Sequence, residues 1–120
     1  MRITRRFAFE AAHRLPFYKG PCSNPHGHSY KLRVSLDAPI ERGTGMSVDF
    51  AELDQVVREN VVAQLDHKDL NDLLENPTAE HIILWVWKRL EGKLPGLCEL
   101  CLAETEDCWV TYGGETVEYR

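Results

Sequence analysis

Two stretches of alternating residues constrain the fold of this chain more than any other feature. Over residues 6–14, Phe7, Phe9 and Ala11 share one parity with His13, whereas Arg6, Glu10 and Arg14 take the other parity. Residues 26–36 alternate in the same way, and two histidines open their apolar parity. A period of two residues is typical of a strand with one buried face. The pattern predicts two such strands, and the intervening residues 15–25, with three prolines and a glycine, predict a loop.

The rest of the chain predicts two helices followed by two more strands. Apolar residues recur at three- and four-residue spacing over 49–65 and again over 78–94, the pattern of an amphipathic helix. Alternation returns over 98–104 and 109–112. The order ββααββ predicts an α+β fold with two helices over one face of a four-stranded antiparallel sheet. No repeat or linker interrupts the chain, so we expect residues 1–120 to form one domain.

Three histidines on the first two strands are candidates for a metal site. His26 and His28 stand two residues apart, so their side chains point to the same face, and His13 ends the neighbouring strand. Three neutral imidazoles suit zinc and leave a fourth position open, as in catalytic zinc sites. The alternative is three histidines that are merely hydrogen-bonded in the core or at the surface. Burying three imidazoles without a shared role is costly, and this favours the metal site.

Cys22 lies in the proline-rich loop, four residues before His26. Its position is compatible with a fourth zinc ligand, with an inert thiol, and with a base or nucleophile beside the metal. A closed site of one cysteine and three histidines is typical of structural zinc. The role of Cys22 therefore decides between a catalytic and a structural centre, and spacing alone leaves it open.

Two further candidate sites carry carboxylates. Asp66 and His67 are adjacent in a polar stretch between the predicted helices, where they form either a proton-transfer pair or a solvated helix end. Glu104 shares the parity of Leu100 and Leu102, where a carboxylate needs a partner. Its two oxygens suit the adjacent N–H and NH₂ donors of a 2-amino-4-oxopyrimidine ring. The alternative for Glu104 is a strand end that reaches water.

Composition limits the partners of the chain. A net charge of −5 argues against a general nucleic-acid binder, and no apolar run approaches the roughly 18 residues of a membrane span. Residues 1–45 nevertheless hold eight Lys and Arg against three Asp and Glu, so this third can accept an anionic small molecule. Four cysteines without a secretion signal are expected to be thiols in a cytoplasmic protein. Cys98 and Cys101 face opposite sides of their strand, which disfavours chelation or a disulfide.

The sequence resembles the 6-pyruvoyltetrahydropterin synthase and 6-carboxytetrahydropterin synthase family of T-fold lyases. The similarity extends over nearly the whole chain. Its motifs are FEAAHRLP at 9–16, CSNPHGHSY at 22–30, GMSVDFAEL at 45–53, LDHKDLND at 65–72, ENPTAE at 75–80 and AETEDCWVTYGGE at 103–115.

The resemblance implies a role for each candidate residue. It implies zinc on His13, His26 and His28, a catalytic Cys22 that is not a ligand, proton transfer by Asp66 and His67, and a pterin anchored by Glu104. It also implies a hexamer of two stacked trimers with active sites at subunit interfaces, where Asp66 and His67 serve a neighbour's Cys22.

The resemblance further implies a reaction on 7,8-dihydroneopterin triphosphate. Family members of the carboxy type usually place three residues between the cysteine and the HGH motif, and members of the pyruvoyl type usually place five. Here Ser23, Asn24 and Pro25 make three. The expectation is therefore a 6-carboxytetrahydropterin synthase of queuosine biosynthesis that also releases acetaldehyde and triphosphate. The rivals are a 6-pyruvoyltetrahydropterin synthase, a non-catalytic zinc or pterin-binding module, and a simple metal hydrolase.

Overall fold

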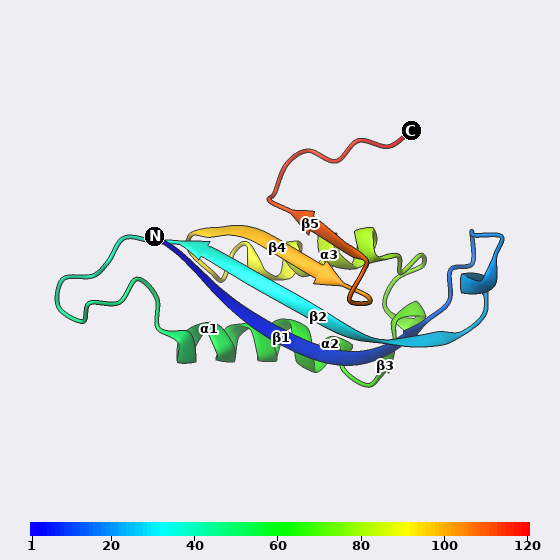
Figure 1. The fold of residues 1–120 in the computed structure, drawn as a ribbon, viewed down its shortest axis with the longest axis horizontal. Helices are drawn as coiled ribbons and strands as arrows, with labels where there is room; N and C mark the ends of the chain where they lie inside the picture. The colour runs from blue at the N-terminus through cyan, green and yellow to red at the C-terminus, as the bar shows by residue number, and fades with distance from the viewer.

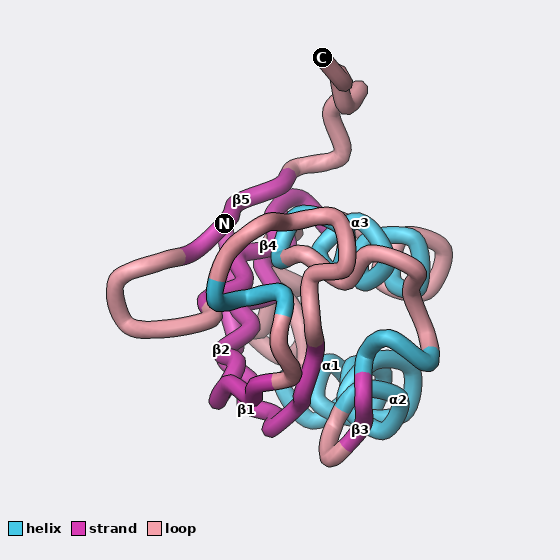
Figure 2. The backbone as a smooth tube through the Cα atoms, turned by 90° about the vertical axis from the view of Figure 1, so that its right-hand side faces the viewer, coloured by secondary structure: helices cyan, strands magenta, loops and turns pink.

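A computed structural model describes residues 1–120 as one sheet with helices on one of its faces (Figures 1 and 2). The elements are β1 (Arg2–His13), η1 (Pro21–Ser23), β2 (His26–Asp37), α1 (Phe50–Val57), η2 (Arg58–Val62), α2 (Ala63–Leu65), β3 (Lys68–Asp69), η3 (Leu70–Asp72), α3 (Ala79–Leu90), β4 (Leu97–Ala103) and β5 (Trp109–Tyr112). None of the helices has the length and apolar character that crossing a bilayer requires.

The two alternating stretches form the centre of the sheet, as predicted. β1 and β2 pair antiparallel over twelve residues each, in a register that runs from Arg2 opposite Asp37 to His13 opposite His26. The parity that begins with the histidines on β2 faces the helices, and Tyr30 on this face is fully buried and stacks on Phe9. The other parity lies on the open face of the sheet. The long register therefore places all three histidines at one end of the β1–β2 pair.

The prediction of four antiparallel strands was wrong by one strand. The sheet has five strands in the order β3-β1-β2-β4-β5, and β3 runs parallel to β1 through Ala11–Lys68 and Ala12–Asp69. β4 pairs antiparallel with β2, and β5 with β4, as expected. Because β3 consists of two exposed polar residues, it carries no hydrophobic pattern that would have predicted it.

The predicted helices lie where the apolar spacing places them. The first runs through α1, η2 and α2 from residue 50 to residue 65, with a π-helical turn in its middle. Asp49 caps it by accepting a hydrogen bond from the backbone N–H of Ala51. Thr78 caps α3 in the same way, through the N–H of His81. Both helices direct their apolar side chains onto the buried face of the sheet.

The core between the helices and the sheet allows a direct test of the packing. Leu100 on β4 is fully buried, whereas Leu73 after η3 is 41% exposed. We expect Leu100→Ala to lower the free energy of unfolding by about 2–5 kcal/mol, because it removes buried methyl groups and leaves a cavity. Leu73→Ala should change it by less than about 0.5 kcal/mol. Urea denaturation of the two variants measures the difference, and equal losses would contradict this description of the core.

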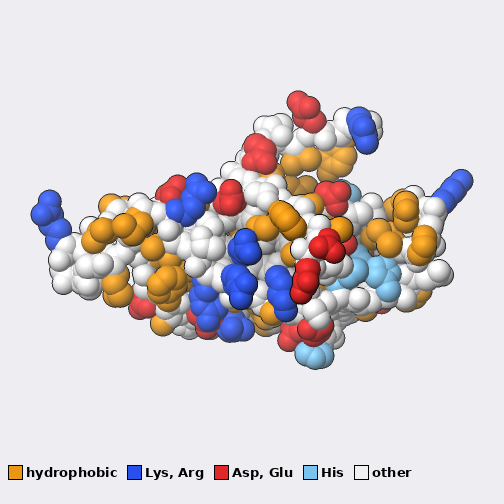
Figure 3. All heavy atoms as spheres, in the orientation of Figure 1, with side chains coloured by type: hydrophobic (Ala, Val, Ile, Leu, Met, Phe, Trp, Pro, Cys, Tyr) orange, Lys and Arg blue, Asp and Glu red, His pale blue; other side chains and the backbone are white.

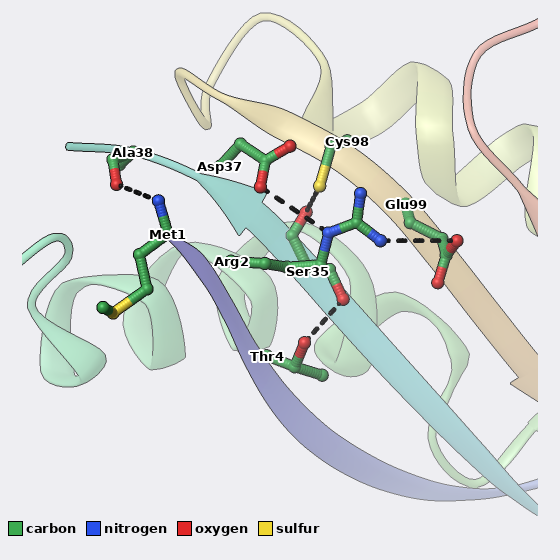
Figure 4. Close-up of polar contacts among 8 residues, drawn as sticks. All are labelled: Met1, Arg2, Thr4, Ser35, Asp37, Ala38, Cys98 and Glu99. Carbon is green, nitrogen blue, oxygen red and sulfur yellow. Dashed lines mark hydrogen bonds and ion pairs between the residues drawn. The ribbon is translucent and has the colours of Figure 1, made fainter.

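At the end of the sheet far from the histidines, polar contacts join neighbouring segments (Figure 4). The N-terminal ammonium of Met1 donates to the carbonyl of Ala38 at 3.0 Å. The Cys98 thiol donates to the carbonyl of Ser35 at 3.3 Å. None of the four cysteines forms a disulfide, so Cys98 has a hydrogen-bonding role here and the CxxC spacing creates no bridge.

Candidate metal centre

The three histidines converge at the end of the β1–β2 pair. The candidate ligand nitrogens of His13, His26 and His28 all lie within 4.8 Å of one another. Their rings meet edge to face, with centroids 4.5 Å apart for His13 and His26 and 5.1 Å apart for His13 and His28. His13 is buried, and the other two are half-buried. The cluster therefore lies at the margin of the core, with His26 and His28 partly accessible to solvent.

Backbone carbonyls orient two of the rings. His13 Nδ1 lies 2.7 Å from the carbonyl oxygen of Pro77, and His26 Nδ1 lies 2.8 Å from that of Asn24. A carbonyl oxygen only accepts, so each Nδ1 carries the proton and each Nε2 keeps its lone pair. The hydrogen bond from Nδ1 thus fixes the tautomer and the ring orientation that a metal ligand needs at Nε2.

The remaining nitrogen atoms fit a cation. His13 Nε2 and His26 Nε2 face each other at 2.9 Å with a lone pair on each. His28 Nε2 is buried and has no hydrogen-bond partner in the protein. Unpartnered polar atoms are costly to bury, and a shared divalent ion would satisfy all three nitrogens. Nitrogen ligands without carboxylates suit zinc and other imidazole-binding metals.

The burial of His28 makes the stability of the metal-free protein depend on pH. Burial lowers the pKa of His28; the Glu104 carboxylate opposes this shift, and the imidazoles of His13 and His26 add to it. The unfolded chain therefore binds a proton more readily than the folded one, and stability falls as pH drops below about 6.5, the ordinary pKa of histidine.

This prediction can be measured by urea denaturation of metal-free protein between about pH 7.5 and about pH 5. The free energy of unfolding should decrease over this range, and His28→Gln should reduce the decrease. His81→Gln is the matched control, because His81 lies on α3 outside the cluster. An equal decrease in His28→Gln and wild type would show that His28 does not cause the pH dependence of stability.

Cys22 lies on η1, in the loop that joins the histidine ends of β1 and β2. Its thiol is half-buried, and its carbonyl oxygen accepts a hydrogen bond from the N–H of Leu15 at 2.8 Å. Its sulfur does not join the group of three ligand atoms. This placement is compatible with a thiol that acts beside the centre, and the closed site of four ligands is not formed.

Backbone hydrogen bonds hold Asp66 and His67 on the edge of β1. The N–H of Glu10 donates to Asp66 Oδ1 at 2.9 Å, and the N–H of His67 donates to the carbonyl of Glu10 at 2.6 Å. Asp66 Oδ1 also lies 3.0 Å from His67 Nδ1. The Glu10 N–H lowers the pKa of Asp66, burial opposes this shift, and His67 adds to it.

The His67 ring is presented to solvent. His67 has a φ of 58°, in the left-handed region, and its side chain is 78% exposed. A pocket of about 510 Å³ beside β1 and β3 is lined by both His67 and His28. His67 and His28 therefore lie along one pocket of a single chain.

Glu104 lies one residue beyond the end of β4 and is half-buried. Burial raises the pKa of Tyr30, and the nearby Glu104 carboxylate adds to this shift. Burial lowers the pKa of His28, and the same carboxylate opposes that shift. A groove of about 830 Å³ is lined by His28, Glu104, Glu106 and Trp109, among others. Glu104 therefore lies at a strand end and lines the same groove as His28.

Several contacts that shape the site were not predicted from the sequence. They include the carbonyl oxygens of Pro77 and Asn24 and the side chain of Asn71, which accepts from the N–H of Arg14 and donates to its carbonyl. Pro77 lies in the motif ENPTAE and Asn71 in the motif LDHKDLND, but neither residue was predicted to have a role in the site.

Comparison with known proteins places the chain in a family. Residues 2–115 match the family model described as 6-pyruvoyl tetrahydropterin synthase. The chain belongs to this family. The family match covers both histidine strands, both helices and β4, so it confirms the resemblance seen in the sequence.

The chain is similar to proteins that are named for three different activities. It is 40% identical over 110 residues to a 6-carboxy-5,6,7,8-tetrahydropterin synthase of Synechocystis sp., covering 86% of this chain and 85% of the relative. It is 40% identical over 95 residues to a dihydroneopterin monophosphate aldolase of Pyrococcus furiosus, covering 79% of each. A solved 6-pyruvoyl tetrahydropterin synthase of Caenorhabditis elegans superposes with a TM-score of 0.87 at 27% identity, covering 96% of each chain. The fold is the T-fold of this family.

Proposed function

We propose that this protein is a zinc-dependent 6-carboxy-5,6,7,8-tetrahydropterin synthase of queuosine biosynthesis. It converts 7,8-dihydroneopterin triphosphate and one water into 6-carboxytetrahydropterin, acetaldehyde and triphosphate. The observation that carries the proposal is the convergence of three imidazoles with the free Cys22 thiol outside their cluster. The Synechocystis relative and the three residues between Cys22 and His26 support the carboxy product.

His13, His26 and His28 are the residues that would hold the zinc ion. When bound, the ion supplies Lewis-acid stabilisation of negative charge that develops on the side-chain oxygens of the substrate. The carbonyls of Pro77 and Asn24 keep two of the rings in the ligating tautomer, so little reorganisation is needed on binding. Three protein ligands leave room for substrate.

The remaining residues move protons and orient the substrate. The Cys22 thiolate removes a proton from the carbon side chain, and His67 returns or relays one. Asp66 stays ionised because the N–H of Glu10 lowers its pKa, and it orients His67 through Nδ1. Glu104 accepts the ring N–H and NH₂ donors and so positions the reacting carbons.

A second copy of the chain completes the site in this proposal. The His67 ring is 78% exposed and points away from its own core. The edge strands β3 and β5 leave unpaired backbone groups at both sides of the sheet. A hexamer of two stacked trimers would close these edges and set the Asp66–His67 pair of one subunit against Cys22 of another. Native mass spectrometry tests the assembly, and a monomer at working concentration would contradict it.

The test of the function is to identify the pterin formed from 7,8-dihydroneopterin triphosphate by the zinc-loaded protein. The proposal predicts 6-carboxytetrahydropterin. Pyruvoyltetrahydropterin would favour the activity named for the C. elegans protein. Aldol cleavage with the phosphate retained on the small fragment would favour the aldolase activity named for the P. furiosus relative. Zinc binding without turnover would favour a binding module.

A further inference from the structure

Three cations on the open face of the sheet have no partner in the chain. Arg6 on β1 lies directly opposite Arg33 on β2, and Lys31 lies two residues from Arg33 on the same face. None of the three takes part in an ion pair. Figure 3 shows Lys and Arg side chains gathered in the middle of this face, with carboxylates and then histidines beside them.

This arrangement differs from that of the other two arginines of β1. Arg5 pairs with Asp54 at 2.8 Å, and Arg2 lies 3.6 Å from Asp37. Like charges directly opposite each other on neighbouring strands destabilise a sheet. The Arg6–Arg33 pair therefore costs stability unless an anion lies between or above the two side chains.

The cations share a groove with the candidate active site. The groove of about 830 Å³ is lined by Arg6, Lys31 and Arg33 as well as by His28 and Glu104. Its charges are segregated. Arg33 lies opposite Cys101 in the middle of β4, whereas Glu104 and Glu106 follow the last residue of β4. At about 3.4 Å per residue, the three residues from Arg33 to the level of Glu104 span about 10 Å.

The groove also connects the two faces of the sheet. β4 pairs with β2 only from Lys31 onward, so residues 26–30 of β2 have β1 on one side and no strand on the other. A ligand can pass round the end of β4 at this point. It can thus contact His28 on the helix side and Lys31 on the open side.

We propose that Arg6, Lys31 and Arg33 form the subsite for the phosphate chain of the substrate, a proposal that rests on the proposed function. Guanidinium groups bind phosphate oxygens in a bidentate manner, and a lysine adds a compact charge. A ring held by Glu104 at one end of the groove and a polyanion held by these cations at the other match its segregated charges. The anion also relieves the repulsion between Arg6 and Arg33.

Binding of inorganic triphosphate tests the subsite without requiring turnover. Titration calorimetry on the full chain should detect binding to wild type, and Lys31→Gln and Arg33→Gln should each weaken it about tenfold or more. Arg42→Gln is the matched control, because Arg42 is exposed in the segment between β2 and α1, outside the groove. Circular dichroism confirms that the variants fold. Absence of binding to wild type, or equal affinity in Arg33→Gln and wild type, overturns the proposal.

Steady-state kinetics with dihydroneopterin triphosphate distinguishes a failure of the phosphate subsite from a failure of the proposed function. In Arg33→Gln, we expect KM to rise about tenfold and by a larger factor than kcat falls. Triphosphate binding that depends on the three cations, without turnover by wild type, supports the subsite and refutes the function. Turnover with unchanged KM and unchanged triphosphate affinity in the variants supports the function and refutes the subsite.

Discussion

Replacement of His13 by Ala is expected to abolish tight zinc binding and, with it, turnover. Zinc sites of four ligands bind with about 10–16 kcal/mol, so the loss of one ligand should weaken affinity by on the order of 10²–10³-fold or more. His13 is also the most buried of the three histidines, and its Nδ1 is fixed by the Pro77 carbonyl. Zinc content after dialysis and competition with a chromophoric chelator measure the loss.

The control for this prediction is His81→Ala. His81 donates through Nδ1 to the Asn76 carbonyl at 2.9 Å and lies outside the cluster. The His81→Ala variant should retain zinc and activity. Wild-type zinc affinity in His13→Ala would contradict the three-histidine centre, and loss of zinc in both variants would point to unfolding, which circular dichroism detects.

Replacement of Cys22 by Ala is expected to remove turnover while zinc stays bound. Loss of a general base typically lowers the rate by about 10²–10⁴-fold. Because the Cys22 sulfur lies outside the histidine cluster, the ligand set should be unaffected. Single-turnover kinetics and zinc content, measured on the same preparation, separate the two effects.

Cys108→Ala is the matched control for the thiol. Cys108 is exposed, and its backbone carbonyl, not its thiol, accepts a hydrogen bond from the N–H of Glu104. The control should retain both zinc and activity. If Cys22→Ala loses zinc together with turnover, Cys22 is a ligand and the catalytic assignment is wrong.

The sequence predicted the buried parts of the fold because burial leaves a periodic pattern. Alternation identified β1 and β2, and it also placed His26 and His28 on the face that carries Tyr30. The convergence of the histidines followed from strand parity together with the position of His13 at the end of β1. Apolar spacing of three and four residues placed both helices within a few residues of their observed ends.

Features fixed by tertiary contacts left no such pattern. β3 contains only two polar residues and is held by backbone pairing to β1, and the side chain of Asn71 on η3 bonds to the backbone of Arg14. His67, the residue before β3, has a left-handed backbone that the sequence pattern did not predict. The carbonyls of Pro77 and Asn24 orient the metal ligands through backbone atoms, which every residue type has. Register alone reveals that Arg6 faces Arg33.

The most direct test of the central claim is the ratio of acetaldehyde to triphosphate released from 7,8-dihydroneopterin triphosphate. We expect equal amounts of the two products. The activity should be lost when a chelator removes zinc and should return when zinc is added back. Release of triphosphate without acetaldehyde would contradict the carboxy synthase assignment. Equal release that persists in the zinc-free protein would contradict the role of the three histidines.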